Sequence, residues 1–578
     1  MVWLEFMEEA MRVPDVARII FNNMEIKNIE TTVNIYAGFL LSRGIDYEKS
    51  IAIILDRTPE CIYTILAAIK IGSPFLLVDK SLPPKRIRFM LKNSGINDII
   101  TEKEYKDDFA DNIVFIEDTK DTLLSEIVVK NKNNIIYLMY TSGSTGNPKG
   151  VEIRRESFFA FIDGVSKIID FSKNKRIACL TSISFDIFFL ESIMSIYKGL
   201  TVILANEDEC VNPRLLSRLI ATNKAEMIQV TPSKMQLLYN FDNTLACLAG
   251  LSEIIIGGEQ LHSKLLTRLQ QKTKAKIYNM YGPTETTIWS SISDITNKKV
   301  IDIGNPIDGT QLYIMNERLE ILPEGDIGEI CIAGKGLAKG YINNPLLTEE
   351  KFVTLNSLHD RAYRTGDYGK FENGVFFFIG RKDNQIKIRG FRIELEEIEK
   401  VLVAFDNIEQ AAAIYLNQED YIEMLIVFYI GKINFDNNIL KEHMREYLPY
   451  YMIPSVFIKL EQFPYTKSGK IDRKEIRNIY VKYYLSPSKN NISFDSKELK
   501  LDDEIFNTIK ENINENIRDL PPNSDFLSLG LDSITYIKLI IALEEKFNFE
   551  FEEDMLVITS FQNIDSMIQY VKQRLSVI

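Results

Sequence analysis

Short apolar runs alternate with helical stretches from about residue 50 to residue 280, and this alternation limits the possible folds of the chain most strongly. Ser50–Asp56 predicts a buried strand. Thr58-Pro59-Glu60 supplies an N-cap, a first-turn proline and a first-turn acid, so we expect a helix that ends at Gly72. A strand with the sequence FLLVD follows, and similar strand–helix pairs recur around 176–199, 201–223, 226–240 and 253–280. The pattern predicts parallel sheets covered by helices.

The rest of the chain predicts further domains, because 578 residues are too many for one hydrophobic core. Frequent glycines and short alternating runs over 300–380 predict a β-rich segment, and 384–480 returns to mixed α and β. The tail shows three helical patterns, near 501–516, 534–546 and 564–575. We expect a large α/β region over 1–382, a small mobile α/β region over 383–485, a polar linker over 486–500 and a four-helix bundle over 501–578.

Charge and composition exclude several classes of function. The net charge is −13, and residues 501–578 hold 15 Asp and Glu against 6 Lys and Arg. Such an acidic chain repels nucleic acid, so we expect no nucleic-acid partner. No apolar run reaches the length of a membrane span, and the N-terminus is acidic where a signal peptide is basic, so we expect a cytoplasmic protein with no membrane partner.

Cysteine and histidine are too scattered to form familiar sites. No two cysteines form a C-x-x-C pair, and the histidines lie far apart, so the sequence indicates neither a disulfide framework, nor a zinc site, nor a Ser-His-Asp mechanism. The residues are Cys61, Cys179, Cys210, Cys247 and Cys331, and His262, His359 and His443.

A glycine-rich loop follows the apolar run IIYLM, and it is the strongest local motif. Tyr140–Gly150 reads YTSGSTGNPKG, where glycines let backbone N–H groups and hydroxyls converge on phosphate and Lys149 adds a mobile charge. It is not a Walker loop, because no G-K-[ST] closes it. The alternative is a polar surface loop. The candidate phosphate-binding residues are Thr141, Ser142, Gly143, Ser144, Thr145, Gly146 and Lys149.

This string resembles the signature of the superfamily that holds acyl-CoA synthetases, luciferases and the adenylation domains of nonribosomal peptide synthetases. Asn279–Thr287, NMYGPTETT, resembles the adenine-binding motif of that family. The resemblance implies that Tyr281 stacks on the base with Asn279 beside it, and that Glu285 is a magnesium ligand. It also adds two residues to the nucleotide site, Gly282 and Thr284.

Three more segments resemble the family in the same order. Tyr363–Asp367, YRTGD, resembles the ribose motif, in which Asp367 accepts hydrogen bonds from the sugar hydroxyls. Gly380–Gly390 resembles the hinge motif, with Asp383 as the pivot and Arg381 near the nucleotide. Lys470 matches the catalytic lysine of the family, which acts together with Lys149 in the phosphate loop. Each segment alone is compatible with a turn or a solvated charge, but their common order favours the adenylating family.

The chemistry that the resemblance implies needs these residue types. A carboxylate that attacks the α-phosphate of ATP passes through a more concentrated negative charge, which Mg²⁺ and a positioned lysine offset. Lys470 lies in the smaller region, so closure of that region completes the site. A second step needs a thiol in place of Lys470, which gives a hinge at Asp383 a mechanistic purpose.

The tail resembles a carrier protein. In FLSLGLDSI, Ser533 matches the serine that carries covalent 4′-phosphopantetheine. It precedes an amphipathic run, so it lies near a helix N-terminus, where a phosphodiester is favoured. The alternative is a plain N-cap serine. Leu531 departs from the Gly-Gly or Gly-His of most peptide carriers and resembles acyl carriers, which leaves the downstream partner open.

The segment Phe185–Glu191, FDIFFLE, suggests which acid is activated. In amino-acid-activating members an aspartate here binds the α-ammonium, and Asp186 fits that position. The resemblance implies a pocket of Asp186, Ile187, Leu190, Gln229, Ile255, Gly257, Met280, Ile288 and Trp289, with Lys470, and this set resembles the family's pattern for glycine. Bulk at Leu190, Met280 and Trp289 excludes larger side chains, and alanine is the nearest competitor. The alternative is that these are core residues.

The sequence therefore predicts an ATP-dependent, AMP-forming amino acid–carrier protein ligase. Glycine and ATP would give glycyl-AMP and pyrophosphate, and the glycyl group would move to the arm on Ser533. The expected partners are the amino acid, a phosphopantetheinyl transferase, downstream biosynthetic enzymes and an MbtH-like protein. A ligase for D-alanine or another carboxylic acid, a non-catalytic scaffold, and an unmodified partner-binding tail remain open.

Overall fold

The computed structural model describes most of the chain. The described residues are 12–105, 112–121, 132–143, 146–355, 360–388, 390–418, 422–433, 435–466, 471–480, 505–506, 508–510, 512, 526, 531, 533–547, 549, 551, 555, 561 and 563–575. They fall into two compact units: the larger comprises Met1–Cys210 and Leu216–Glu394, and the smaller comprises Val211–Leu215 and Leu395–Ile578. Lys470 and the expected linker over 486–500 lie outside the described residues.

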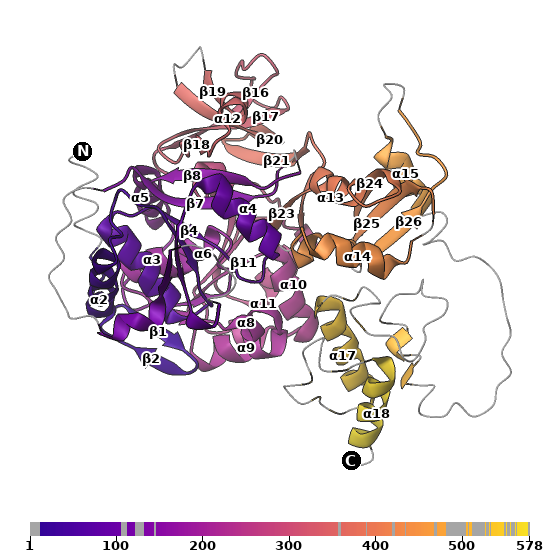
Figure 1. The fold of residues 1–578 in the computed structure, drawn as a ribbon, viewed down its shortest axis with the longest axis horizontal. Coiled ribbons are helices and arrows are strands. Elements are labelled where there is room, and N and C mark those ends of the chain that lie inside the picture. The colour runs from indigo at the N-terminus through magenta and orange to yellow at the C-terminus, as the bar shows by residue number, and fades with distance from the viewer. Residues whose placement is uncertain are drawn as a thin grey trace. The chain divides into compact units, whose positions relative to one another are not determined.

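Two large mixed sheets form the centre of the larger unit (Figure 1). In the nine-stranded sheet the order is β15-β14-β13-β12-β11-β9-β10-β1-β2, and its strands from β13 to β1 are parallel. These strands are β1 (Arg18–Phe21), β2 (Met24–Ile26), β9 (Arg176–Cys179), β10 (Thr201–Leu204), β11 (Met227–Val230), β12 (Glu253–Gly257), β13 (Lys276–Tyr281), β14 (Ser291–Asp294) and β15 (Asn305–Pro306).

The seven-stranded sheet has the order β18-β8-β7-β4-β3-β5-β6, and β8 pairs antiparallel with both of its neighbours, β7 and β18. Its strands are β3 (Ile51–Ile54), β4 (Phe75–Leu77), β5 (Asp98–Thr101), β6 (Ile113–Phe115), β7 (Ile135–Thr141), β8 (Lys149–Arg154) and β18 (Gly340–Tyr341). Their apolar runs are almost wholly buried, as expected for parallel strands with both faces covered.

Helices join these strands, so the predicted α/β alternation is confirmed. The helix predicted after Thr58 is α3 (Pro59–Ile71), and it ends at Gly72, whose φ of 80° is the left-handed conformation that glycine adopts freely. Thr58 occupies the N-cap position without a side-chain capping hydrogen bond. The other helices are α2 (Ile29–Ser42), α4 (Pro84–Ser94), α5 (Arg155–Ser166), α6 (Ile187–Phe189), α7 (Ser195–Tyr197), α8 (Glu207–Val211), α9 (Pro213–Thr222), α10 (Pro232–Phe241), α11 (Ser263–Lys272) and α12 (Pro345–Lys351).

The segment over 300–380 is β-rich, as predicted. Its five-stranded sheet has the order β16-β17-β20-β19, and β21 also pairs with β20. The strands are β16 (Thr310–Met315), β17 (Gly328–Gly334), β19 (Phe352–Leu355), β20 (Asp360–Glu372) and β21 (Val375–Arg381). A two-stranded hairpin follows, β22 (Gln385–Ile388) and β23 (Phe391–Glu394). The hairpin belongs to the larger unit, so the structural division falls after Glu394, whereas the sequence placed it after residue 382.

The smaller unit contains a three-stranded sheet and the helices of the tail. The sheet joins β24 (Ile408–Gln418), β25 (Ile422–Gly431) and β26 (Val456–Lys459), and its region contains α13 (Leu395–Val403), α14 (Asn437–Arg445) and α15 (Arg473–Tyr480). In the tail, two of the three predicted helices are α17 (Ser533–Phe547) and α18 (Ile564–Leu575), with an apolar core that includes Ile505, Tyr536 and Met567. Within the described ranges, none of the helices combines the length and apolar character that crossing a membrane requires.

Candidate active site

Motifs that lie far apart in the sequence come together at the carboxyl ends of the parallel strands. Gln229 lies in β11, Gly257 ends β12 and Tyr281 ends β13. Open α/β sheets bind ligands outside this end of their strands. The strand order β11-β12-β13 therefore places the expected substrate and nucleotide residues side by side.

The glycine-rich loop connects two antiparallel strands of the seven-stranded sheet. Thr141 ends β7 directly opposite Lys149, which begins β8. The N–H of Gly146 donates to the carbonyl of Gly143 over 2.9 Å, which tightens the loop. The loop therefore returns Lys149 to the place where the chain left the sheet. Two predicted loop residues lie outside the described part of the chain, Ser144 and Thr145.

A fully buried carboxylate, Glu285, lies next to this loop. Lys149 Nζ is 3.1 Å from Glu285 Oε1, and the Tyr341 hydroxyl donates to the same oxygen over 2.7 Å. Arg392 Nη1 is 2.8 Å from Glu285 Oε2. Burial alone would raise the pKa of Glu285, but Arg392 and Lys149 hold it well below its usual range. Glu285 is therefore ionised and balanced by two cations.

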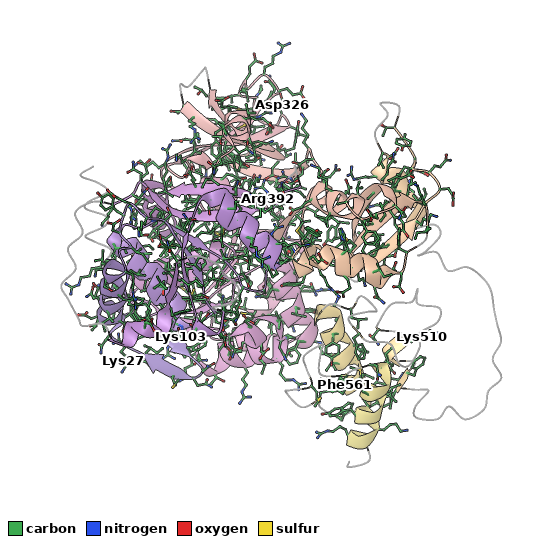
Figure 2. All side chains as sticks on the ribbon, viewed as in Figure 1. Lys27, Lys103, Asp326, Arg392, Lys510 and Phe561 are labelled. Carbon is green, nitrogen blue, oxygen red and sulfur yellow. The ribbon has the colours of Figure 1, made fainter. Side chains whose placement is uncertain are left out.

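The same cluster concentrates positive charge beside the loop. Burial and the neighbouring Arg392 lower the pKa of Lys149, whereas Glu285 favours the charged lysine. Arg392, labelled in Figure 2, lies on β23, and its carbonyl accepts a hydrogen bond from Ser142 Oγ over 2.7 Å. The hairpin and the glycine-rich loop therefore meet at Glu285, and both supply groups that bind phosphate.

Glu285 supplies a ligand of the kind that the implied magnesium ion takes, and Lys149, Tyr341 and Arg392 already contact its two oxygens in this structure. A carboxylate oxygen is a hard ligand, and Mg²⁺ in nucleotide sites takes one or two carboxylates with phosphate oxygens and water as the remaining ligands. Among the described residues no group of three or more His, Cys, Asp or Glu side chains is placed to hold a metal. A single carboxylate at Glu285 agrees with a metal that is bound mainly through the nucleotide.

One chain of hydrogen bonds joins Tyr281, Asp367, Arg381 and Asp383. The Tyr281 hydroxyl donates to Asp367 Oδ2 over 2.6 Å, and Arg381 Nη1 donates to Asp367 Oδ1. Asp367 in β20 lies opposite Arg381 in β21. Arg381 also binds Asp383 through Nε and Nη2, at 2.7 and 2.8 Å. The predicted adenine-side tyrosine, ribose carboxylate and hinge aspartate are thus directly coupled.

Two more residues of the expected nucleotide motif have structural roles of their own. Asn279 donates from Nδ2 to the carbonyl of Asp302 over 2.8 Å. Gly282 permits a close approach, because a Cβ at that position would lie 2.7 Å from the nitrogen of Ser290 and 2.8 Å from the oxygen of Ile288. The motif therefore also shapes the segment that leads to Trp289.

Asp186 is buried without a counter-ion among the described residues. Its side chain is 6% exposed, and Oδ2 has no hydrogen-bond partner in the described part of the chain. Burial raises the pKa of Asp186 to about 6, although a hydrogen bond from Thr284 favours the ionised form. The site therefore lacks one positive charge next to Asp186, and a bound cation would satisfy it.

A helix with an unusual turn begins immediately after Asp186. The α-helical turns α6 and α7 flank a π-helical turn, Leu190–Met194. Such turns are rare and occur frequently at functional sites. Glu191, in this turn, is fully buried and accepts N–H hydrogen bonds from Leu180 over 2.6 Å and Thr181 over 2.9 Å. These bonds tie the helix that carries Ile187 and Leu190 to the end of β9.

The predicted pocket residues of the sheet share one face. Gln229 pairs with Ile255 across β11 and β12, and Gly257 pairs with Met280 across β12 and β13. Alternate residues of a strand point to the same face, so the four positions line one surface. All nine predicted pocket residues are buried: Asp186, Ile187, Leu190, Gln229, Ile255, Gly257, Met280, Ile288 and Trp289.

Trp289 covers Gly257 on this surface. A Cβ on Gly257 would lie 2.6 Å from Cη2 and 2.9 Å from Cζ2 of the indole. The two residues before Trp289 have left-handed backbone angles, with φ of 63° at Thr287 and 67° at Ile288. This conformation is costly for β-branched residues, at about 1–3 kcal/mol each, and is found at functional sites. The strained turn places the indole over Gly257, among the predicted pocket residues.

The structure adds residues that the sequence reasoning did not single out. Arg392 lies two residues beyond the quoted hinge motif, and Tyr341 lies in no quoted motif, yet both contact Glu285. Tyr137 in β7 has a buried hydroxyl without a partner among the described residues, and burial and the nearby Asp186 raise its pKa. Tyr137 was missed because it lies within a regular apolar strand. Arg392 could have been identified from the sequence, because it is a basic residue just after the hinge motif.

Two predicted residues of the smaller unit are only partly placed. Lys470 lies outside the described residues, although Tyr465 and Ile471 on either side of it form an isolated β-bridge. Ser533 begins α17, which agrees with the expected helix N-terminus. The roles of both residues remain predictions.

Three family models match separate parts of the chain. The model for "AMP-binding enzyme" matches residues 6–342, and the model for "AMP-binding enzyme C-terminal domain" matches residues 397–470. The model for "Phosphopantetheine attachment site" matches residues 503–571.

The chain also resembles synthetases in sequence and structure. It is 33% identical over 489 residues to the dimodular nonribosomal peptide synthase of Bacillus subtilis (strain 168), covering 82% of this chain and 20% of that protein. A four-domain nonribosomal peptide synthetase solved with AMP and glycine matches at a TM-score of 0.60 and 28% identity, over 99% of this chain and 42% of that one. A synthetase with adenylation and PCP domains shares the fold at a TM-score of 0.81, with 21% identity, over 99% and 96%. The chain therefore spans a fifth of the length of the Bacillus relative.

Proposed function

The chain belongs to the AMP-binding enzyme family, and on this premise we propose that it activates glycine with ATP and loads it onto its own carrier region. The observation that carries the proposal is the buried carboxylate of Asp186, which has no ion-pair partner, and whose Oδ2 has no hydrogen-bond partner, among the described residues. The α-ammonium of an amino acid supplies the cation that this carboxylate lacks. Fatty and aryl acids carry no such charge, so the proposal restricts the substrate to an amino acid.

In the first step, the amino acid carboxylate attacks the α-phosphorus of ATP, and the bond to pyrophosphate breaks. Negative charge concentrates on the phosphate, and Lys149 and Arg392 lie beside Glu285 where they offset it. Magnesium held by Glu285 would neutralise the charge of the phosphates. We assign to Lys470 the role of a further cation that the smaller unit brings to the reacting phosphate.

In the second step, a thiol attacks the carbonyl of the aminoacyl adenylate, and the C–O bond to AMP breaks. Phosphopantetheine on Ser533 would supply this thiol. We assign to Asp383 the hinge at which the chain turns to exchange Lys470 for the thiol, and a turn there would also move the hairpin that carries Arg392. The bidentate contact between Arg381 and Asp383 couples that hinge to the ribose carboxylate Asp367.

Glycine is the amino acid that suits the pocket. Trp289 covers Gly257, and Met280 and Leu190 are buried at predicted pocket positions, which supports a substrate with a small side chain or none. The solved synthetase that is 28% identical to this chain contains AMP and glycine, which supports the same choice. Alanine and D-alanine are the nearest alternatives, because each adds a single methyl group.

The proposal implies several partners. A phosphopantetheinyl transferase would modify Ser533, and downstream enzymes would use the glycyl group. An MbtH-like protein is a further proposed partner of the adenylating region. The match to the phosphopantetheine attachment model over residues 503–571 supports the transferase, and the other partners rest on the family resemblance alone.

A non-catalytic scaffold with the same fold is the second candidate. The unpartnered Asp186 Oδ2 and the two cations on Glu285 speak against it, because a scaffold has no need to bury such groups. Loss of activity in a Lys470→Ala variant of an active enzyme would exclude this candidate.

ATP–pyrophosphate exchange by the purified chain, with each proteinogenic amino acid and D-alanine, tests the proposed function. We expect a dominant signal with glycine. A dominant signal with another acid would retain the adenylation mechanism and contradict the pocket assignment. Absence of exchange with every acid, with and without an MbtH-like protein, would contradict the proposed activity.

A further inference from the structure

The pocket contains more polar groups than glycine needs. Both amide atoms of Gln229, Oε1 and Nε2, are buried without a hydrogen-bond partner among the described residues, and so is the indole Nε1 of Trp289. Gln229 is 1% exposed and Trp289 is 2% exposed. Buried polar groups are nearly always hydrogen-bonded, so these groups indicate a bound polar molecule.

These groups lie on the same surface of the sheet. Gln229 pairs with Ile255, and Gly257 is two residues further along the same strand and therefore faces the same side. The Trp289 ring covers Gly257. Gln229 and Trp289 thus border the same face of the sheet, and Asp186 is the proposed partner of the ammonium.

Glycine has no side chain that can hydrogen-bond to Gln229. We propose that Gln229 holds a water molecule beside the bound glycine, and that displacement of this water is what rejects alanine. A water molecule needs two to four polar partners, and the two amide atoms of Gln229, which have no partner among the described residues, are candidates for them, as is Trp289 Nε1. This inference rests on the proposed function and extends it to the way in which the pocket discriminates.

The size of the preference for glycine over alanine distinguishes this mechanism from steric exclusion alone. One methyl group in an apolar pocket changes specificity by about 10- to 200-fold. A methyl that removes the water also leaves the Gln229 amide unpaired, which adds a factor of about 5 to 150. The two factors together give a preference for glycine over alanine in kcat/KM of about 50- to 30,000-fold, with no editing step.

Gln229→Leu tests the inference, because leucine is apolar and at least as large as glutamine. If water on Gln229 rejects alanine, the substitution lowers the glycine-to-alanine ratio of kcat/KM in pyrophosphate exchange by about 5- to 150-fold. Steric exclusion predicts an unchanged or higher ratio, because no space is gained. Gln229→Met makes the same change with an unbranched side chain and serves if the leucine variant does not fold.

Ile228→Leu is the matched control, since Ile228 is a fully buried apolar residue that precedes Gln229 in β11 and packs in the apolar cluster on the opposite face of the sheet. We expect it to leave the glycine-to-alanine ratio within about threefold of the wild type. An unchanged ratio in both Gln229 variants, with glycine exchange retained, would overturn the inference and leave the proposed function intact. Wild-type exchange that is stronger with serine than with glycine would instead show that Gln229 binds a substrate hydroxyl, and would overturn both.

Discussion

At the scale of single residues, two buried carboxylates in the same site have opposite surroundings. Glu285 faces Lys149 and Arg392, which hold its pKa well below the usual range despite burial. Asp186 has no ion-pair partner among the described residues, and burial raises its pKa to about 6. The protein itself supplies the cations that balance Glu285, whereas a cationic substrate would balance Asp186.

The raised pKa of Asp186 predicts how amino acid binding depends on pH. In the free protein the carboxyl group binds a proton more tightly than in the unfolded chain, so ionising it costs stability as the pH rises through about 6. The substrate ammonium needs the ionised form. We therefore expect the KM for glycine to rise by about tenfold per pH unit below about pH 6, while the KM for ATP does not follow it.

Initial-rate measurements between pH 5 and 8 in the exchange assay check this expectation. An Asp186→Asn variant removes the titrating group, so its KM for glycine should be high at every pH and should lose this pH dependence. A wild-type KM for glycine that stays constant down to pH 5 would contradict the assignment of Asp186 to the ammonium.

At the scale of elements, the turn after β13 determines the pocket. Gly282 allows the chain to approach Ser290, and the left-handed angles at Thr287 and Ile288 direct Trp289 over Gly257 in β12. The pocket wall is thus formed by strands β12 and β13 together with a strained connection that begins where β13 ends. Its shape depends on a close approach of backbone and ring rather than on the pocket side chains alone.

Gly257→Ala should disturb this wall. The new Cβ would lie 2.6 Å from Trp289 Cη2, so the ring must move or the strand must shift, which costs about 1–3 kcal/mol. We expect a clear loss of kcat/KM for glycine and a change in tryptophan fluorescence, measured by exchange kinetics and emission spectra. Gly250→Ala is the control, because its Cβ would meet only the Ala225 oxygen, at 3.6 Å. If the two variants lower kcat/KM for glycine equally, the contact between Gly257 and Trp289 does not shape the pocket.

The β22–β23 hairpin is the second element that the site depends on. Arg392 on β23 contacts Glu285, the carbonyl of Arg392 accepts from Ser142, and Gly390 donates its N–H to Glu259 Oε1 over 2.6 Å. Removal of one partner of a buried ion pair costs about 3–5 kcal/mol, and Lys149 remains to reduce that cost here. Arg392→Met should therefore lower the free energy of unfolding by up to about 3 kcal/mol.

Urea unfolding followed by tryptophan fluorescence measures this effect in the larger unit, because both tryptophans of the chain, Trp3 and Trp289, belong to it. Arg318→Met is the matched control, since Arg318 is exposed. If the two variants unfold at the same urea concentration, the Arg392–Glu285 pair does not stabilise the unit.

At the scale of the whole molecule, the sequence predicted the α/β alternation, the β-rich segment and the helical tail, because each is encoded in local periodicity. It also predicted that Lys149, Glu285 and Asp186 serve one site, because their motifs follow one another in the order typical of the adenylating family. It did not predict the contacts of Tyr341 and Arg392 with Glu285, which depend on how distant strands align. Nor could it reveal the left-handed turn at Ile288, because a β-branched residue favours the opposite backbone conformation.

In the proposed function, the chain both activates the amino acid and accepts the activated product. Intact-protein mass spectrometry, after incubation with a phosphopantetheinyl transferase, coenzyme A, Mg²⁺, ATP and glycine, measures both at once. We predict the added mass of one phosphopantetheine arm plus one glycyl group, and no addition in Ser533→Ala, which should still catalyse glycine-dependent pyrophosphate exchange. An arm without a glycyl group, in a chain that is fully modified and supplied with ATP and glycine, would contradict the central claim.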